Sequence, residues 1–183
     1  MRIRIISGTF KGRFINVPQS KLIRPTADRV RETLFNLLNN KITFDGINVL
    51  ELYAGSGSLG LECISRGAGS VTFIENNYLI CKNLEENIRS LGVENLCSIK
   101  KIKAVDFSKR KADLQFDLIL ADPPYFKDDI HQVVENLKTN NYFKEDCMMI
   151  IERSIETKVQ DVEHFKVEPF KIIGDTCLYE LYE

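Results

Sequence analysis

Two short segments of this 183-residue chain carry residue types and spacings that could bind a ligand and do chemistry. The first, E-L-Y-A-G-S-G-S-L-G, places Glu51 at the end of an apolar run and Gly55, Gly57 and Gly60 after it. Glycines allow a tight turn and let backbone N–H groups approach a ligand that a Cβ atom would exclude. The G-x-G-x-x-G pattern alone fits either a dinucleotide pyrophosphate or S-adenosylmethionine. Because the Glu51 carboxylate repels phosphate and attracts a cationic amino or sulfonium group, we favour S-adenosylmethionine.

Three further residues are candidate cofactor contacts. Tyr53 lies within the glycine motif itself. Glu75 ends the apolar run SVTFIE, about 20 residues after the first glycine, where an acid can accept both ribose hydroxyls. Asp106 could reach the adenine amino group, although it could equally be a helix N-cap ahead of FSKRK.

The second segment is D-P-P-Y, formed by Asp122, Pro123, Pro124 and Tyr125 directly after the apolar run FDLILA. Two prolines remove two backbone donors, so the loop presents carbonyl oxygens and the Asp122 carboxylate as acceptors. These acceptors fit the exocyclic amine of a nucleobase, because holding its N–H groups positions the nitrogen for in-line attack on a sulfonium methyl. Tyr125 would stack on a base that is single-stranded or flipped out. Taken alone, D-P-P-Y is also typical of a rigid turn, and only its combination with the glycine motif favours catalysis.

An alternation of apolar runs and helix-period segments determines where these motifs lie. The strand candidates are residues 47–53, 70–75, 97–102 and 116–121, and the helical segments between and after them are 58–67, 77–92 and 131–140. This alternation predicts an α/β fold, with a mostly parallel sheet covered by helices on both faces. Further on, a strand candidate at 147–154 precedes two segments, 165–174 and 176–183, that are spaced for an antiparallel hairpin. Both motifs follow strands, and ligands bind at the carboxyl ends of strands in such sheets.

The first 40 residues differ in character from the rest and predict a small extension. RIRIIS and RFINVP flank the turn-like GTFKG, which indicates a β-hairpin. A helix should follow, capped by Thr26 or Asp28 and presenting Val30, Leu34 and Leu38 on one face. We therefore divide the chain into an extension, residues 1–40, and a catalytic domain, residues 41–183.

The charge of the chain is unevenly distributed. The formal net charge is -1, yet residues 1–31 hold eight of the 25 basic residues and one of the 26 acidic residues. A basic extension of this kind fits an RNA phosphate backbone. The candidate RNA contacts are Lys11, Arg13, Arg24, Arg29 and Arg31. Arg29 and Arg31 are two apart and cannot share one helical face, so we expect one of them to support the loop instead.

Other features exclude whole classes of protein. No apolar run is long enough to span a membrane, and no secretory signal begins the chain, so we expect a cytoplasmic protein. The five cysteines form no C-x-x-C or Cys/His cluster, which argues against zinc, iron–sulfur clusters and a disulfide framework. The 44% hydrophobic content is enough for a buried core, so disorder is not expected.

The chain resembles the RsmD-type class I S-adenosylmethionine-dependent methyltransferases, which modify N2 of guanine 966 in bacterial 16S ribosomal RNA. The blocks that carry the resemblance span nearly the whole chain: RIISGTFKGR, RPTADRVRETLFNLL, LELYAGSGSLGLECISRGA, FIE, ILADPPY and GDTCLYELY. The resemblance implies a Rossmann-like seven-stranded sheet with an antiparallel last strand. It also implies cofactor contacts at Glu51, Gly55, Gly57 and Glu75 and a catalytic loop at residues 122–125. Its substrate would be 16S rRNA or the assembling small ribosomal subunit.

We therefore predict a 16S rRNA (guanine-N2-)-methyltransferase that uses S-adenosylmethionine, leaves S-adenosylhomocysteine, needs no metal and acts as a monomer. The nearest alternative keeps the cofactor but methylates N6 of adenine or N4 of cytosine in DNA, and only the whole-chain resemblance argues against it. A nucleotide-dependent oxidoreductase would have no use for the proline-rich acceptor loop. An RNA-binding module on a decayed cofactor domain is disfavoured by the intact motifs.

Overall fold

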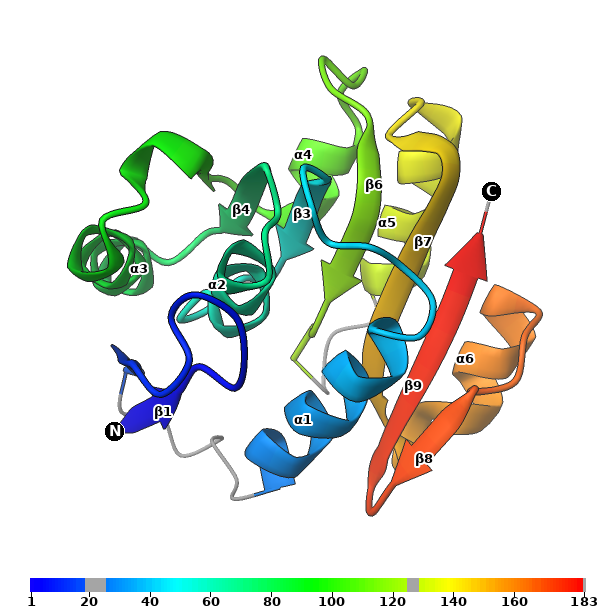
Figure 1. Ribbon diagram of the computed structural model, residues 1–183. Helices are drawn as coiled ribbons and strands as arrows, with labels where there is room; N and C mark the ends of the chain where they lie inside the picture. The colour runs from blue at the N-terminus through cyan, green and yellow to red at the C-terminus, as the bar shows by residue number, and fades with distance from the viewer. Residues whose placement is uncertain (19–25, 125–128, 183) are drawn as a thin grey trace.

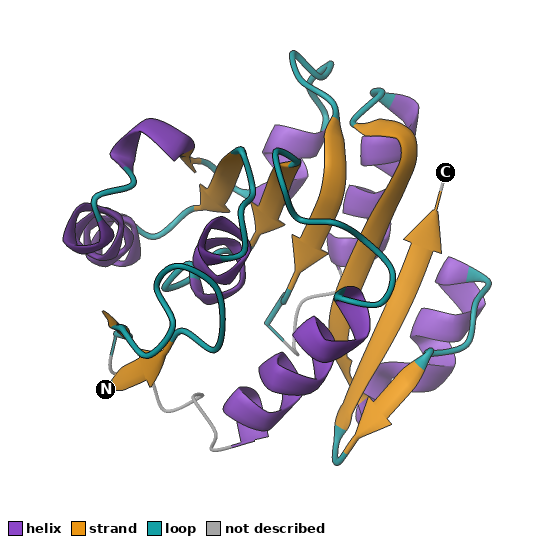
Figure 2. Cartoon of the chain, in the orientation of Figure 1, coloured by secondary structure: helices purple, strands orange, loops and turns teal. Residues whose placement is uncertain are grey.

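The computed structural model describes residues 1–18, 26–124 and 129–182. The chain begins with a two-stranded hairpin and a helix, and the remainder forms a sheet with helices on both faces (Figures 1 and 2). The strands are β1 (Arg2–Arg4), β2 (Phe14–Asn16), β3 (Asn48–Leu52), β4 (Ser70–Glu75), β5 (Cys97–Lys101), β6 (Phe116–Ala121), β7 (Phe143–Ser154), β8 (Lys171–Ile173) and β9 (Thr176–Tyr182). The helices are α1 (Thr26–Leu38), α2 (Ser58–Ser65), α3 (Tyr78–Leu91), α4 (Ala104–Ser108), α5 (Asp129–Thr139) and α6 (Lys158–Phe165), with short 3₁₀ turns η1 (Glu94–Leu96) and η2 (Ile155–Thr157).

The main sheet has seven strands in the order β5-β4-β3-β6-β7-β9-β8. The first five in that order are mutually parallel, whereas β9 pairs antiparallel with both β7 and β8. The strand order reverses between β3 and β6, since β3 has β4 on one side and β6 on the other. The Rossmann-like seven-stranded sheet predicted from the sequence is confirmed, including its antiparallel end. A reversal of this kind opens a crevice at the carboxyl ends of the strands, and the two motif loops leave from β3 and β6 there.

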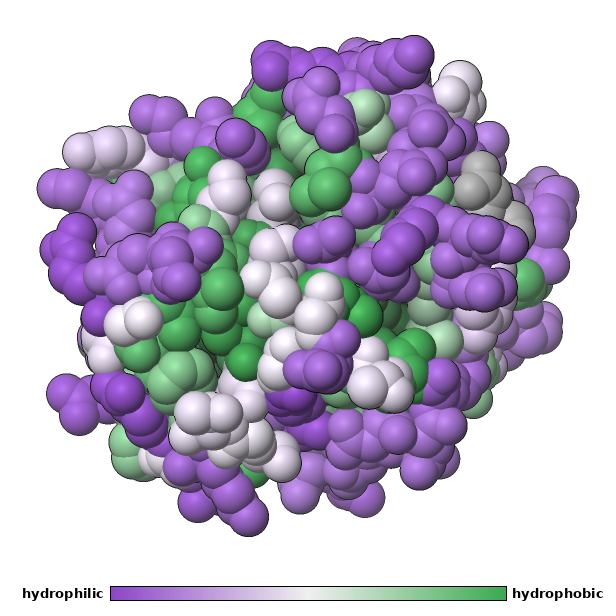
Figure 3. All heavy atoms as spheres, turned by 45° about the horizontal axis from the view of Figure 1, so that its top comes forward, coloured by the Kyte–Doolittle hydropathy of each residue, from purple (hydrophilic) through white to green (hydrophobic). Residues whose placement is uncertain are grey.

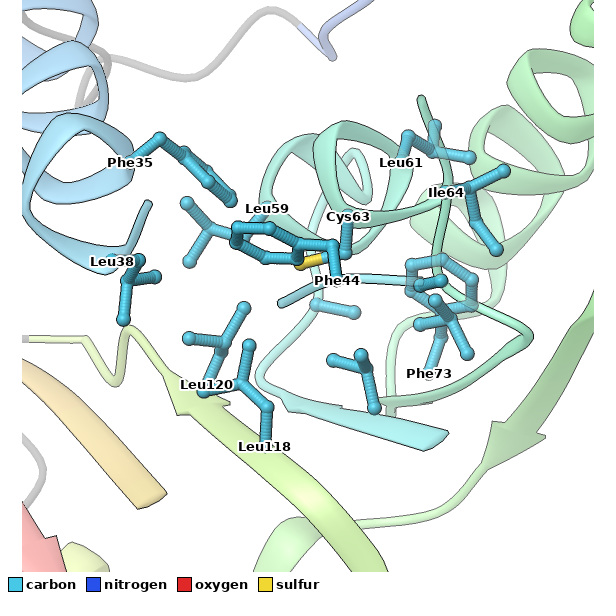
Figure 4. Close-up of a cluster of buried hydrophobic side chains, with 14 of the residues drawn as sticks. Phe35, Leu38, Phe44, Leu59, Leu61, Cys63, Ile64, Phe73, Leu118 and Leu120 are labelled. Carbon is cyan, nitrogen blue, oxygen red and sulfur yellow. The ribbon is translucent and has the colours of Figure 1, made fainter. Parts of the chain in front are cut away.

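Two apolar clusters hold the helices against the sheet. One cluster gathers side chains of α1, α2 and α3 on one face, and the other gathers α4, α5 and α6 on the opposite face. Figure 4 shows part of the first, in which Phe35 and Leu38 of α1 lie toward Leu118 and Leu120 of β6. The outline of the molecule in Figure 3 is mostly hydrophilic, with apolar atoms showing mainly near its middle. Packing of the helices on both faces holds the strands in place and so positions the loops that follow them.

The predicted hairpin is present, and its turn is held firmly against α2. The backbone N–H groups of Ile6 and Ser7 donate to the Glu62 carboxylate at 2.8 and 3.0 Å. Glu62 is fully buried and pairs with Arg66 at 2.8 Å. Gly8 has a φ of 80°, and a Cβ atom there would lie 1.7 Å from the Ser65 carbonyl oxygen, so no other residue fits. Side chains of residues 1–40 therefore pack into the same apolar cluster as side chains of the main sheet and of α2 and α3.

One stretch of the C-terminal prediction was wrong. Residues 165–174 were expected to form a strand, but Phe165 ends helix α6 and the strand β8 covers only Lys171–Ile173. Val162 and Phe165 pack into the second apolar cluster from α6, so burial rather than strand propensity determines the conformation here. The helix has only eight residues, which is too short for a clear helical period in the sequence.

Candidate active site

The two motif loops begin at the same level of the sheet. Leu52 of β3 is in register with Ala121 of β6, so the chain leaves both strands side by side into the glycine turn and the D-P-P segment. In Figure 1 the arrowheads of β3, β4 and β6 point toward the end of the molecule where β1 and α1 lie. The structure thus brings together the two segments that the sequence singled out, and it places the basic extension at the same end.

Glycine is required at the three positions of the motif for different structural reasons. Gly55 and Gly57 have φ angles of 55° and 77°, a conformation that favours glycine. A Cβ atom on Gly55 would meet nothing closer than 3.9 Å, so this part of the turn borders open space. A Cβ on Gly60 would lie 2.6 Å from both the Glu51 carboxylate and the Phe73 ring, which makes Gly60 a packing residue beneath the turn. Among the three, Gly55 is therefore the one best placed to let a ligand approach the backbone.

Glu51 lies under the glycine turn. Its two carboxylate oxygens accept hydrogen bonds from the N–H groups of Leu59 and Gly60, at 3.3 and 2.8 Å, in the first turn of α2. The side chain is only 3% exposed, and this burial raises the pKa of Glu51 from 4.5 to about 8, against the opposing effect of the two hydrogen bonds. Nearby Asp122 and Glu75 raise it further. Glu51 thus stabilises the glycine turn, and its raised pKa keeps the carboxyl group largely protonated at neutral pH. The predicted direct contact with the cofactor stays a prediction.

Glu75 links the glycine turn to the start of α3. One carboxylate oxygen accepts from the Gly55 N–H at 3.1 Å, and the other accepts from the N–H groups of Asn76 and Asn77 at 2.8 Å each. Asn77 in turn caps α3 with its side chain. A carboxylate fixed in this way beside Gly55 keeps free lone pairs, which is what the predicted ribose contact requires.

Asp122 and the two prolines follow β6 directly. Pro123 is buried and Pro124 is half-buried, whereas the Asp122 side chain is exposed. Burial by the surrounding protein nevertheless raises the pKa of Asp122 from 3.8 to about 6. Tyr125, the last residue of the motif, lies outside the described residues.

Four acids stand in a row at this edge, one on or after each of four neighbouring strands. They are Glu75, Glu51, Asp122 and Glu152, on β4, β3, β6 and β7 respectively. Within the part of the chain that the structure describes, no lysine or arginine pairs with any of them. Unpaired carboxylates at this density favour a cationic ligand. S-adenosylmethionine fits these residues, since its cationic groups would meet the acids, its ribose would meet Glu75 and its backbone contacts would fall at Gly55.

Tyr53 connects the two motif loops. Its hydroxyl group donates a hydrogen bond to the Asp129 carboxylate at 3.0 Å, and Asp129 is the first residue of α5, just after the D-P-P-Y loop. Tyr53 itself has a φ of 55°, an uncommon value for a residue other than glycine. The structure therefore gives Tyr53 a part in positioning the loop, in addition to the cofactor contact predicted for it.

Comparison with known proteins identifies the family. The family model described as "Conserved hypothetical protein 95" matches residues 3–182. Ribosomal RNA small subunit methyltransferase D of Escherichia coli strain K12 is 32% identical over 183 residues, which cover all of this chain and 90% of that protein. The Haemophilus influenzae protein of the same name is 33% identical over 187 residues, covering 99% of this chain and 93% of the relative. The chain belongs to this methyltransferase family.

Solved structures agree with this membership. A putative methyltransferase from Escherichia coli superimposes with a TM-score of 0.82 at 28% identity, covering 98% of this chain and 97% of the other. A shorter similarity, 31% identity over 86 residues and 45% of this chain, links it to a tRNA1(Val) (adenine(37)-N6)-methyltransferase of Shewanella sediminis. Membership of the family implies S-adenosylmethionine as the methyl donor, in agreement with the fit of the acidic row.

The candidate RNA contacts are in different environments. Lys11 and Arg29 are exposed. Arg13 is exposed as well, but it donates to the carbonyl oxygen of Ser90 and lies over the Phe10 ring. Arg31 is only 6% exposed and donates to the Arg4 carbonyl oxygen at 2.6 Å, so it supports the extension through the backbone of β1, whereas the sequence had suggested pairing with Asp28 or Glu32. Arg24 lies outside the described residues.

Asp106 does not cap its helix. It is exposed in the first turn of α4, and the N-cap position belongs to Lys103. The proposed alternative role as an N-cap was therefore wrong, and a contact with adenine stays a prediction.

A separate hollow of about 890 Å³ lies against β4, β5 and α4. Among the residues that line it are Thr72, Ile99, Phe107 and Tyr142, and none of the predicted site residues belongs to it. This hollow is therefore separate from the predicted site at the acidic row.

Sequence reasoning missed two groups of residues. His131 lies 2.7 Å from Asp161, which also pairs with the fully buried Arg153 at 3.0 Å. This network joins α5, β7 and α6 and is structural. The other missed residue is Glu152, whose only signal was an acid at the end of the apolar run MMII.

Three further observations bear on the sequence predictions. All five cysteines are free thiols. No three His, Cys, Asp or Glu side chains gather as metal ligands in the described ranges. None of the described helices combines the length and apolar character needed to cross a bilayer.

Proposed function

We propose that this protein transfers a methyl group from S-adenosylmethionine to the exocyclic N2 of a guanine in small-subunit ribosomal RNA. The single observation that carries the proposal is Asp122, an exposed acceptor at the strand-order reversal, beside a glycine turn and an unpaired row of acids. Two relatives named as ribosomal RNA small subunit methyltransferases, matched over 90% and 93% of their length, support the RNA substrate.

The residues divide the work by position. When bound, S-adenosylmethionine supplies an electrophilic methyl group on a sulfonium. Asp122 and the carbonyl oxygen of Pro123 accept the N–H bonds of the amine and direct its nitrogen lone pair toward that methyl. Since Asp122 is exposed and titrates near neutrality, its carboxylate can also take up the proton that the amine loses and pass it to water. In this scheme Tyr125 stacks on the flipped-out base, as its place in the motif predicts.

The extension would bind the RNA backbone. Lys11 and Arg29 are exposed, basic and carried by elements at the same end of the molecule as the acidic row (Figure 1). Phosphate contacts position an RNA without reading its sequence, so residues 1–40 would hold the substrate while residues 41–183 carry out the transfer.

A second candidate substrate is an adenine amine. The partial similarity to an adenine-N6 methyltransferase shows that a related cofactor domain can serve that base. Guanine N2 is preferred because the relatives that match over the full length are named as small-subunit ribosomal RNA enzymes.

The test is transfer of a tritiated methyl group, followed by nucleoside analysis of the product. The substrates are small ribosomal subunits lacking the modification, naked 16S rRNA and DNA. We expect N2-methylguanosine from the ribosomal substrates. Methyladenosine, or a product formed only on DNA, would overturn the proposal.

A variant pair checks the role of the aspartate. Asp122→Ala should lower turnover by roughly 100-fold or more with cofactor affinity nearly unchanged, since it removes an acceptor that acts on the reacting amine. The matched control is Asp113→Ala, an exposed aspartate before β6 that lies outside the acidic row. Equal turnover in the two variants would remove Asp122 from the mechanism.

A further inference from the structure

Asp122 has a neighbour of the same charge at the end of the next strand. Ala121 of β6 is in register with Ile151 of β7, so Asp122 and Glu152 are the next pair along these parallel strands, about 5 Å apart in backbone spacing. Leu120 and Ile150 pack into the first apolar cluster, and side chains alternate along a strand, so Asp122 and Glu152 both face the side that α1 and α2 cover. The two strands run side by side in Figure 1.

Glu152 has no visible structural task. Within the residues that the structure describes, neither carboxylate of the pair has a hydrogen-bond or ion-pair partner, although Glu152 is half-buried. The adjacent Arg153 points to the opposite face, where it pairs with Asp161. Burial, followed by the charge of Asp122, raises the pKa of Glu152 well above its usual range. A fold gains nothing from two unpaired acids placed together, which points to a use in binding.

The chemistry of the bases shows what that use is. In guanine, the ring N1–H stands next to the N2 amine on the Watson–Crick edge. In adenine and cytosine, the ring nitrogen next to the amine carries a lone pair instead. A carboxylate beside the amine site therefore gains a charge-assisted hydrogen bond from guanine and repulsion from the other two bases.

We propose that Glu152 is the residue that selects guanine, its carboxylate accepting the N1–H while Asp122 accepts the adjacent N2 amine. This inference rests on the proposed function and gives it a physical basis for the choice of base. The cationic cofactor at the same edge favours the ionised form of both acids. A Glu152 that kept its proton would instead donate to N1 of adenine, and the experiment separates the two cases.

The test uses RNA with either guanosine or 2-aminopurine riboside at the methylated position. 2-Aminopurine keeps the exocyclic 2-amine but carries a lone pair at N1. The wild-type protein should prefer guanosine by at least ~10-fold in kcat/KM, because the analogue leaves Glu152 unpaired. Glu152→Gln should narrow that preference by ~10-fold, since a glutamine amide can donate to the N1 lone pair of 2-aminopurine or accept from guanine.

The matched control is Glu156→Gln, the same chemical change at an exposed residue four positions further on. It should keep the wild-type preference. Unchanged affinity for S-adenosylhomocysteine and a melting temperature no lower than that of the wild-type protein would show that Glu152→Gln folds. If wild-type protein makes N2-methylguanosine and Glu152→Gln keeps the full preference, this inference falls alone. If wild-type protein methylates adenine, the proposed function falls with it.

Discussion

Binding of the cofactor should release a proton from Glu51. Burial raises the pKa of this carboxyl to about 8, so at pH 7 it is roughly nine-tenths protonated in the empty protein. A cation ~6 Å from a carboxylate contributes ~2.8 kcal/mol at an effective dielectric constant of ~20, which lowers a pKa by ~2 units. The pKa of Glu51 would then fall to ~6, and binding at pH 7 would release ~0.8 proton.

Titration calorimetry measures this release directly. Binding of S-adenosylmethionine at pH 7 in buffers of different ionisation enthalpy should give an observed enthalpy that varies with the buffer, with a slope of ~0.8 proton released per site. The release should shrink toward zero above pH 9, where Glu51 is already ionised, and below pH 5, where it stays protonated in both states. In the Glu51→Gln variant this proton release, and with it the dependence of the binding enthalpy on the buffer, should disappear.

Two results would refute this reasoning. The first is an enthalpy at pH 7 that does not depend on the buffer, and the second is an unchanged release in Glu51→Gln. A companion measurement concerns stability: because the folded pKa of Glu51 is raised, the free energy of unfolding of the empty protein should fall as pH rises from about 4.5 to about 8. Melting curves of Glu51→Gln, which loses one hydrogen bond to α2 but does not titrate, should be flatter over that window.

Three other changes have definite outcomes. Asp161→Asn removes the carboxylate that pairs with the buried Arg153 at 3.0 Å and should lower the free energy of unfolding by ~3–5 kcal/mol in urea titrations; a loss below ~1 kcal/mol would contradict a stabilising role for this ion pair. Tyr53→Phe removes the hydrogen bond to Asp129 and should lower kcat by ~3–10-fold with cofactor affinity unchanged. Single-turnover kinetics and calorimetry measure the two quantities, and an equal loss of rate and of cofactor affinity would show a cofactor contact instead. Because the pKa of Asp122 in the free protein is raised to about 6 and its ionised form accepts the amine, kcat/KM for S-adenosylmethionine should rise with pH through about 6 and then level off, and Asp122→Asn should flatten this profile; a falling limb there would contradict the role.

The parts of the fold that sequence reasoning predicted are those with strong local signals. Buried parallel strands are apolar along their length, so β3, β4 and β6 stand out as continuous runs. Gly55 and Gly57 were predicted to shape a turn, and their positive φ angles confirm it. Signals of this kind depend on a few adjacent residues, so the features can be predicted without knowledge of the tertiary structure.

The parts that were missed depend on contacts between distant segments. Glu62 lies within a predicted helical segment, and it is buried where the turn of the hairpin, 55 residues away, uses it as an acceptor. His131 and Asp161 meet across 30 residues. Glu152 reaches Asp122 only through the register of β6 and β7. No pattern within a window of sequence contains such information, and register in particular is fixed by packing on both faces of the sheet.

The uneven charge of the chain has a physical consequence for how RNA could approach. The basic residues concentrated in residues 1–31 attract a phosphate backbone, whereas the Asp122 carboxylate and, once a cationic cofactor favours their ionised forms, those of Glu51 and Glu152 repel one. A phosphate could therefore rest on the extension but not at the catalytic edge. A neutral base with N–H groups on its edge has no such barrier, and it gains hydrogen bonds where the phosphate loses energy. The acids would thus do more than hold a cationic cofactor: they would admit the base and exclude the backbone that carries it, so that only a nucleotide turned out of its helix can reach the methyl group.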